Sequence, residues 1–320
     1  MLFEEAEKIT WIGGEGYAFG AWTAAGAFAA VLCLLCCCRR MKLKAGTGLL
    51  MGFASLVCGL ICSRLFFCLT TQELGVLLPV AGWIRVSEGG WSTTGLILGV
   101  LLAGWTTAKL TGQNPAKLLD AGCLALPLFM IAERLGEATS PDFNISRVIS
   151  EETEGGGWLT VQDIYGTYLA VFRIAAIVAL ALFLVLETVS RRRETKPGDV
   201  CVIFLVLFGS VSILTESLRY DAFLSYHFVK FQMVGAALML GAGLLFAGKR
   251  SPRAPKSWKI ASGICLFLMV GIVIGLEFVL DRTEASKPLV YLGMAVSIAV
   301  PAALGLAEIR RERRGGMKRV

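Results

Sequence analysis

Long apolar stretches alternate with short clusters of charge along almost the whole chain. The apolar stretches are about 18 residues or longer, which is enough to cross a ~30 Å hydrocarbon core as a helix. Backbone groups in lipid must form their hydrogen bonds within their own segment, so helices are the expected form. The pattern predicts transmembrane helices at about 17–38, 47–69, 92–110, 117–135, 163–188, 199–217, 227–247, 259–280 and 288–307. The predicted fold class is therefore an all-α, polytopic membrane helix bundle of about nine transmembrane helices.

The basic residues then predict the orientation of this bundle. They follow the first, fifth and seventh helices and form the tail: Arg39, Arg40, Lys42 and Lys44, then Arg191, Arg192 and Arg193, then Lys249, Arg250, Arg253 and Lys256, then Arg310, Arg311, Arg313, Arg314, Lys318 and Arg319. An excess of Lys and Arg marks the cytoplasmic side of a membrane protein. An odd number of helices puts all four clusters on that side, so we predict an external N-terminus and a cytoplasmic C-terminus.

Composition agrees with this interpretation and excludes other classes. The chain is 56% hydrophobic and only 17% charged, which is too apolar for a soluble domain of 320 residues. The net charge of +7 is spread over the cytoplasmic loops, so it gives no reason to expect nucleic acid as a partner. The ten cysteines lie mostly inside apolar stretches, as small apolar residues do. We expect neither a metal site nor another cofactor.

The two longest loops on the predicted outer side cover about 70–91 and 136–162. The first contains Pro79, Trp83 and Trp91 among apolar residues, which favours an amphipathic arm at the membrane interface. The second is polar and glycine-rich, so we expect it to be mobile. A Gly48–Gly52 spacing in the second helix is typical of close helix packing.

Charged residues within or beside the apolar stretches are candidates for function, because charge is costly in the membrane. Most lie at predicted outer ends, namely Arg64, Glu133, Arg134, Glu137, Glu216, Arg219 and Glu277. Arg173 is the exception, since it falls about ten residues into the predicted fifth helix and near the midplane. Singly, each could be a side chain that reaches to the interface. As a group they predict a polar cavity that suits a lipid phosphate, because guanidinium binds phosphate oxygens in a bidentate way.

The motifs, taken in order, resemble the prolipoprotein diacylglyceryl transferase family over about residues 17–247. The matching pieces are Ser63-Arg64-Leu65-Phe66, the stretch from Gly89 to Gly95, Asp120, Pro127, Glu133-Arg134-Leu135-Gly136, Tyr165, Lys196-Pro197-Gly198-Asp199 and the stretch from Glu216 to Asp221. The resemblance implies a bacterial cytoplasmic membrane protein with a transferase-like domain over residues 1–247. Residues 248–320 then form an added two-helix hairpin and a basic tail.

Four positions depart from the family's pattern. Thr94 stands where the family usually has His, and Glu137 stands where its signature has Asn. Gly166 replaces a Glu, and Ser212 stands where the family usually has Arg. Functional polar positions have therefore changed, although the order of the motifs remains.

The resemblance also implies a reaction, in which the thiol of a lipobox cysteine in a prelipoprotein signal peptide takes a diacylglyceryl group from phosphatidylglycerol. Positive side chains would hold the lipid phosphate. We assign this site to Arg134, Arg219 and Arg64, and we include Glu216 in the same group. The catalytic candidates are Glu137, His227, Thr94 and Tyr17. Thr94 is not a base near neutral pH, so Glu137 or Glu133 is the preferred proton acceptor.

Two other functions are open at this point. An inactive or repurposed relative would keep the cavity and bind an anionic phospholipid or a membrane partner, and the four changed positions favour it. A transporter would show internal repeats and broken helices at the midplane, and the sequence shows neither.

Overall fold

The computed structural model describes residues 8–11, 14–71, 91–139, 146, 148–150, 157–163, 166–219, 225–226, 229–251, 254–283 and 285–317. Within these residues, nine helices are long and apolar enough to cross a membrane. They are α1 (Ala18–Arg40), α2 (Thr47–Thr71), α5 (Thr93–Thr111), α6 (Pro115–Gly136), α7 (Val171–Ser190), α8 (Asp199–Leu218), α9 (Phe231–Arg250), α10 (Lys256–Arg282) and α11 (Lys287–Met317). The prediction of an all-α, polytopic membrane bundle is confirmed.

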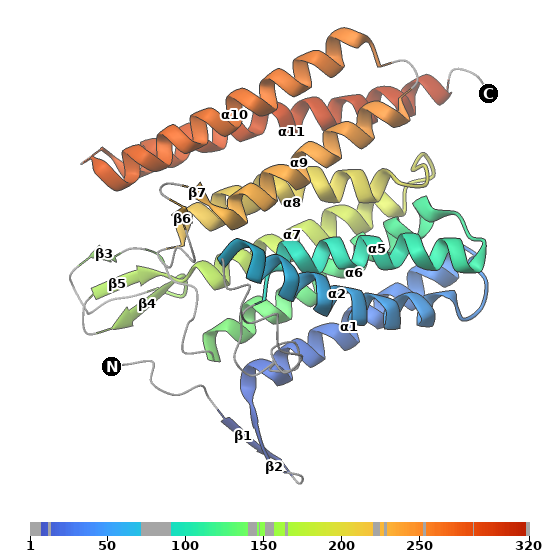
Figure 1. The fold of residues 1–320 in the computed structure, drawn as a ribbon, viewed down its shortest axis with the longest axis horizontal. Coiled ribbons are helices and arrows are strands. Elements are labelled where there is room, and N and C mark those ends of the chain that lie inside the picture. Colours follow the sequence, from blue (N-terminus) through green and yellow to red (C-terminus); the bar gives the residue numbers. More distant parts are fainter. Residues whose placement is uncertain are drawn as a thin grey trace.

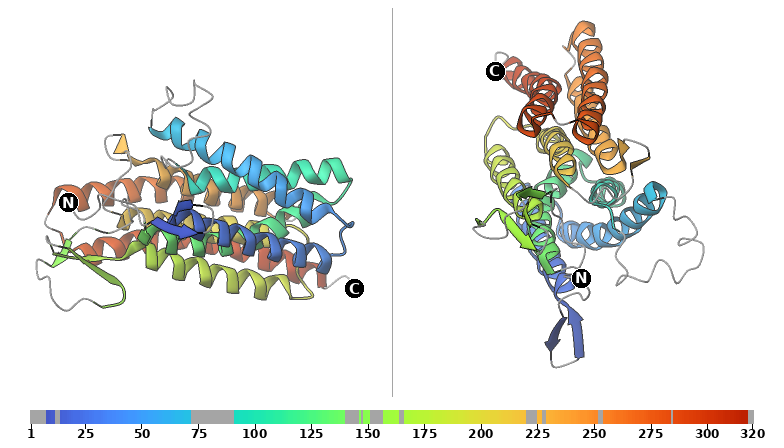
Figure 2. Two further views of the ribbon diagram at one scale, coloured as in Figure 1. Left: turned by 90° about the horizontal axis from the view of Figure 1, so that it is seen from below. Right: turned by 90° about the vertical axis from the view of Figure 1, so that its left-hand side faces the viewer.

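The helices run roughly side by side, and short strands gather at one end of them (Figure 1). Seen along the helices, α10 and α11 lie on the opposite side of the bundle from α1 and α2 (Figure 2). The strands form three small antiparallel sheets. They are β1 (Lys8–Trp11) with β2 (Gly14–Tyr17), then β3 (Val148–Ser150) and β4 (Thr160–Asp163) on either side of β5 (Gly166–Leu169), then β6 (Ser225–Tyr226) with β7 (Val229–Lys230).

Glycines permit a close contact between the backbones of α5 and α2. A Cβ atom added to Gly99 would lie 2.6 Å from the Cα atom of Gly59, and one added to Gly95 would lie 2.7 Å from the Cα atom of Ser63. Only glycine allows two backbones to approach this closely. The predicted Gly48–Gly52 spacing lies against α1 instead, since a Cβ atom added to Gly52 would lie 3.5 Å from Val31.

The end of the bundle that carries the basic loops is held together by ion pairs and hydrogen bonds. Arg40 joins the end of α1 to the end of α7 through Glu187, with 2.9 Å between Nη1 and Oε1. Lys196, in the turn before α8, pairs with Glu312 of α11 at 3.1 Å. The basic segments after α1, α7 and α9 and on α11 thus meet at one end, as the positive-inside pattern requires.

Four buried or partly buried charges at this end form what we call the inner cluster: Asp120, Asp199, Arg250 and Arg313. Asp120 of α6 accepts hydrogen bonds from the backbone amides of Gly198 and Cys201 at the start of α8. A carboxylate at a helix N-terminus satisfies amides that have no partner within the helix. Asp199 pairs with Arg250 at 3.0 Å and with Arg313 at 2.8 Å. The inner cluster therefore joins α6, α8, α9 and α11.

The structure corrects the predicted start of the fifth helix. Residues Gly166–Leu169 form β5, and α7 begins only at Val171, eight residues after the predicted start at 163. Arg173 is consequently in the first turn of its helix, and its predicted place near the midplane is wrong. Its guanidinium donates to the carbonyl oxygens of Trp158 and Thr160 and lies over the Trp158 ring, with 5.9 Å to the centroid. These contacts hold Arg173 against the sheet rather than in the apolar part of the bundle.

The loop predictions have mixed outcomes. The polar loop at 136–162, which the sequence predicts to be mobile, contains β3 and part of β4 among its described residues. Most of the first loop, with Pro79 and Trp83, lies outside the described residues, so the predicted interfacial arm stays a prediction.

Candidate functional site

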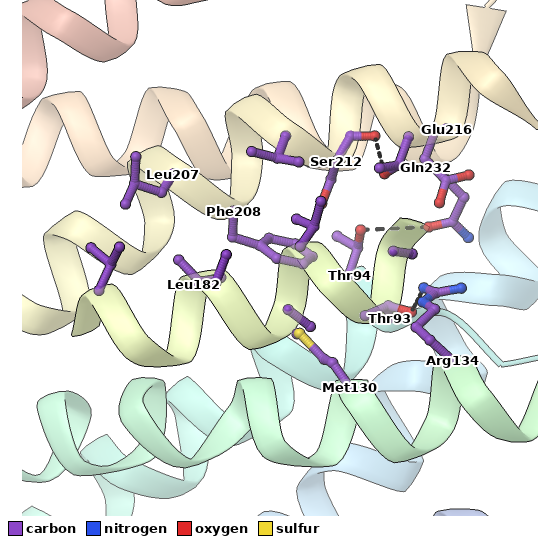
Figure 3. Close-up of a pocket in the computed structure, with 17 residues that line it drawn as sticks. Thr93, Thr94, Met130, Arg134, Leu182, Leu207, Phe208, Ser212, Glu216 and Gln232 are labelled. Carbon is purple, nitrogen blue, oxygen red and sulfur yellow. Dashed lines mark hydrogen bonds between the residues drawn. The ribbon is translucent and has the colours of Figure 1, made fainter. Parts of the chain in front are cut away.

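A cavity of about 280 Å³ lies between α5, α6, α7, α8 and α9. Its polar side chains gather towards one end and its apolar side chains towards the other (Figure 3). The polar end contains Thr93, Thr94, Arg134, Ser212, Thr215, Glu216 and Gln232. The apolar walls come largely from α7 and α8 and include Leu182, Val185, Leu207 and Phe208. One end of the cavity is therefore charged, and the rest is an apolar corridor that runs along α7 and α8.

Arg134, in the last turn of α6, is at the centre of the polar end. Its Nη1 atom donates to Glu137, its Nη2 atom donates to Thr93 Oγ1 at 2.8 Å, and its Nε atom is 3.6 Å from Glu133 Oε2. The side chains of Glu133, Arg134 and Glu137 are each exposed by less than a fifth. The helical spacing of three residues brings Glu137 onto the same face as Arg134. Arg134 is thus held in place from two helices.

The end of α8 supplies the second ion pair. Arg219 Nη1 lies 3.3 Å from Glu216 Oε2, and Ser212 is one turn before Glu216 on the same face. Glu216 interacts electrostatically with both Glu133 and Arg134 across the gap between α6 and α8. We call Glu133, Arg134, Glu137, Glu216 and Arg219 the outer cluster. The sequence prediction grouped all five by their predicted depth, and the structure brings them together.

A network of uncharged polar side chains completes the polar end. Ser92 caps α5 and its hydroxyl donates to Gln232 Oε1 at 3.1 Å, while Thr94 Oγ1 lies 3.5 Å from the same oxygen (Figure 3). Ser63 of α2 holds the backbone of Ser92 with two hydrogen bonds of 2.8 Å. The sequence prediction does not include Gln232 and names Thr93 only within the stretch from Gly89 to Gly95, because neither residue is charged and neither was assigned a role from the resemblance. Polar residues near the outer ends of apolar stretches are the signal that would have found them.

The outer cluster is not electrically balanced. Its three glutamates and two arginines carry a formal charge of −1 when all are ionised. Glu133 Oε2 and Glu137 Oε2 are buried and accept no hydrogen bond within the described residues. One proton taken up by either oxygen would bring the formal charge of the cluster to zero.

The remaining predicted residues lie elsewhere or outside the described residues. Arg64 of α2 is buried and lies over the Trp91 ring at 5.6 Å, and it is not among the residues that line the cavity. Tyr17 ends strand β2, next to the start of α1, but its side chain is outside the described part. His227 is outside it entirely. Their assigned roles stay predictions.

Glu277 also fails to reach the cavity. It lies on α10 and accepts a hydrogen bond from Ser217, on a side of α8 that does not line the cavity. Within the described residues, no group of three His, Cys, Asp or Glu side chains is placed to hold a metal ion.

The sequence profile of the prolipoprotein diacylglyceryl transferase family matches residues 10–248. The chain is 23% identical over 218 residues to the phosphatidylglycerol–prolipoprotein diacylglyceryl transferase of Clostridioides difficile (strain 630), which covers 64% of this chain and 79% of the relative. It is 26% identical over 205 residues to the protein of the same name from Gloeobacter violaceus, covering 60% and 73%.

Proposed function

We propose, because the chain belongs to the prolipoprotein diacylglyceryl transferase family, that it transfers a diacylglyceryl group from phosphatidylglycerol to a prelipoprotein cysteine. The membrane in question would be the bacterial cytoplasmic membrane. The single observation that carries the proposal is the cavity, which joins the outer cluster to an apolar corridor along α7 and α8. Its shape suits a lipid whose phosphate lies at the polar end and whose acyl chains lie along the helices.

The proposed reaction forms one bond and breaks one. The cysteine sulfur attacks the glyceryl carbon that carries the phosphate, a C–S bond forms, and the C–O bond to the phosphate breaks. Glycerol phosphate leaves with the bonding electron pair, and the thiol loses its proton. The step needs a proton acceptor near the thiol and positive charge near the departing phosphate.

Arg134 and Arg219 would supply the positive charge. Thr93 and Glu137 hold the guanidinium of Arg134 with hydrogen bonds, so the guanidinium is already oriented before lipid binds. Arg219 is held by Glu216 on the facing helix. We assign Arg64 a supporting role, as the sequence predicts, at a greater distance from the cavity.

Glu137, or Glu133 beside it, would accept the thiol proton. Each has a buried carboxylate oxygen with no hydrogen-bond partner within the described residues. Protonation of either would remove one negative charge from the outer cluster as the phosphate acquires charge, so the two events would assist each other. Thr94, which stands at the usual histidine position, would contribute only a hydroxyl beside Gln232.

The test is complementation of a transferase-depleted bacterium, together with the purified full chain in nanodiscs that contain phosphatidylglycerol. A synthetic prelipoprotein peptide with one lipobox cysteine should gain the mass of a diacylglyceryl group in mass spectrometry, and glycerol phosphate should appear in equal amount. A peptide with Ser in place of that Cys should gain no mass.

Absence of added mass in both assays, with the protein confirmed in the membrane, would refute transfer. Retention of phosphatidylglycerol through purification without turnover would support the inactive, lipid-binding relative instead. That outcome would trace to the changed positions Thr94, Glu137, Gly166 and Ser212.

A further inference from the structure

Helices α10 and α11 follow the part of the chain that matches the family profile, and they pack against α8 and α9. Most of their large apolar side chains point away from the bundle, as expected for helices that face lipid. Two charged side chains of the same helices, both glutamates, are buried instead. Glu277 of α10 is 4% exposed and Glu308 of α11 is 2% exposed. A buried carboxylate on a membrane helix is costly, so each calls for a specific partner.

Glu277 binds the last turn of α8. The hydroxyl of Ser217 donates to Glu277 Oε1 and also lies 3.5 Å from the sulfur of Met294. Tyr291 of α11 donates to the carbonyl oxygen of Ser217 at 3.4 Å. Side chains from both helices of the hairpin therefore hold one residue, through its hydroxyl and through its backbone.

That residue is next to the outer cluster. Glu216 precedes Ser217 and lines the cavity, and Arg219 follows two positions later and pairs with Glu216. The backbone carbonyl of Glu216 also accepts the amide of Arg219 at 3.3 Å, where α8 ends. The final turn of α8 thus has one face in the cavity and another fixed by the hairpin. Any displacement of Ser217 would move Glu216 and Arg219 with it.

We propose that Glu277 is a positioning residue, which holds the last turn of α8 so that Glu216 faces the cavity with Arg219 paired to it. The inference rests on the proposed transferase function for its effect on turnover. Glu277 does not line the cavity, and its effect on Glu216 would pass through Ser217.

The hairpin provides a matched control at its other end. Glu308 of α11 accepts a hydrogen bond of 2.6 Å from Ser251, just beyond the end of α9, and both residues are buried. Glu308 also lies 3.8 Å from Arg311. The two Glu–Ser pairs share their chemistry and burial, but only the Glu277 pair adjoins the cavity.

The experiment compares Glu277→Leu, Glu277→Gln, Ser217→Ala and Glu308→Leu in the full chain. Glu277→Leu should lower kcat about tenfold or more, since small misplacement of a binding group is costly to catalysis. Ser217→Ala should act in the same direction and serves if Glu277→Leu folds poorly. Glu277→Gln keeps an oxygen acceptor for Ser217 and should stay within about threefold of wild type. Glu308→Leu should leave kcat unchanged per folded molecule.

Hydrogen exchange gives a second measurement that needs neither lipid nor turnover. Peptides covering residues 212–219 should exchange faster in Glu277→Leu and Ser217→Ala, and at the wild-type rate in Glu308→Leu. Equal loss of kcat in Glu277→Leu and Glu308→Leu, or unchanged exchange and kcat in Glu277→Leu, would overturn the proposal. If the wild-type chain shows no transfer while exchange still responds to Glu277, the proposed function fails and the positioning contact stands.

Discussion

Both ends of the bundle bury ionised side chains, but they use them differently. In the inner cluster, all four carboxylate oxygens of Asp120 and Asp199 accept hydrogen bonds or ion pairs, and the two aspartates balance two arginines, although Arg250 Nη1 and Arg313 Nη2 have no hydrogen-bond partner within the described residues. In the outer cluster, glutamates outnumber arginines, Glu133 Oε2 and Glu137 Oε2 accept no hydrogen bond within the described residues, and the side chains of Arg134 and Glu216 line a cavity. The inner cluster resembles a joint between helices, whereas the outer cluster resembles a binding site.

The difference teaches that buried charge alone does not identify a functional site in a membrane bundle. Removing one partner of a buried ion pair is strongly destabilising, so charge that is paired away from a cavity bears mainly on stability. Incomplete compensation beside a cavity favours ligand binding and proton transfer. The comparison predicts that changes in the outer cluster reduce turnover more than stability, and that changes in the inner cluster do the reverse.

The largest effect is expected from Arg134→Ala. Removing a fixed donor to developing charge costs about a hundredfold to a thousandfold in rate. Turnover of the lipobox peptide in nanodiscs should fall by that amount, while size-exclusion chromatography shows the same folded species. Arg250→Ala removes an arginine from the inner cluster and should leave turnover per folded molecule near wild type. More than a tenth of wild-type activity in Arg134→Ala would contradict the placement of the phosphate.

Asp199→Ala tests the same comparison in the inner cluster. The change leaves Arg250 and Arg313 without their shared carboxylate, which should destabilise the protein by about 3–5 kcal/mol. Reversible unfolding in mixed micelles measures this loss. Arg40→Ala breaks a more exposed ion pair with Glu187 and should cost at most about 1 kcal/mol. If Asp199→Ala instead lowered turnover without loss of stability, the two clusters would not differ as described.

The sequence predicts much of this fold because membrane helices are long apolar stretches and because Lys and Arg gather at their cytoplasmic ends. All nine predicted spans correspond to helices, and most ends agree to within a few residues. The error at α7 has a physical cause, since Thr167 to Val171 continues the apolar pattern of the helix that follows. A short apolar strand cannot be told from a helix turn by hydrophobicity alone. The misplaced depth of Arg173 follows from the same error.

The site is only partly predictable. The arginines and glutamates of the outer cluster are visible because charge in an apolar stretch is rare. Their partners are not visible, since Thr93 is 41 residues from Arg134 in sequence and Gln232 meets Ser92 across 140 residues. Glu277 carries the same sequence signal as Glu216, yet it lies on the far side of α8 from the cavity. Helix rotation decides such cases, and the apolar pattern of a lipid-embedded helix does not specify it.

A smaller effect is expected from Gln232→Leu, which removes the uncharged polar group from α9 at the polar end of the cavity. Ser92 and Thr94 would lose a shared acceptor, and a lipid headgroup would lose a polar contact. Loss of one such hydrogen bond corresponds to about a tenfold rise in KM for phosphatidylglycerol, with little change in kcat. Gln113→Leu, the same exchange in the turn between α5 and α6, is the control. A fall in kcat with constant KM would place Gln232 in the chemical step instead.

The smallest effect is expected from Thr94→Val, which tests whether Thr94 acts together with the outer cluster. The change removes a hydroxyl whose contact with Gln232 is long, at 3.5 Å, so turnover should fall by less than about threefold. Thr93→Val removes a 2.8 Å hydrogen bond to Arg134 and should reduce turnover about tenfold. Steady-state rates of the two variants, measured side by side, decide between them. If Thr94→Val reduced turnover more than Thr93→Val, catalysis would depend on Thr94, which stands at the usual histidine position, rather than on the orientation of Arg134.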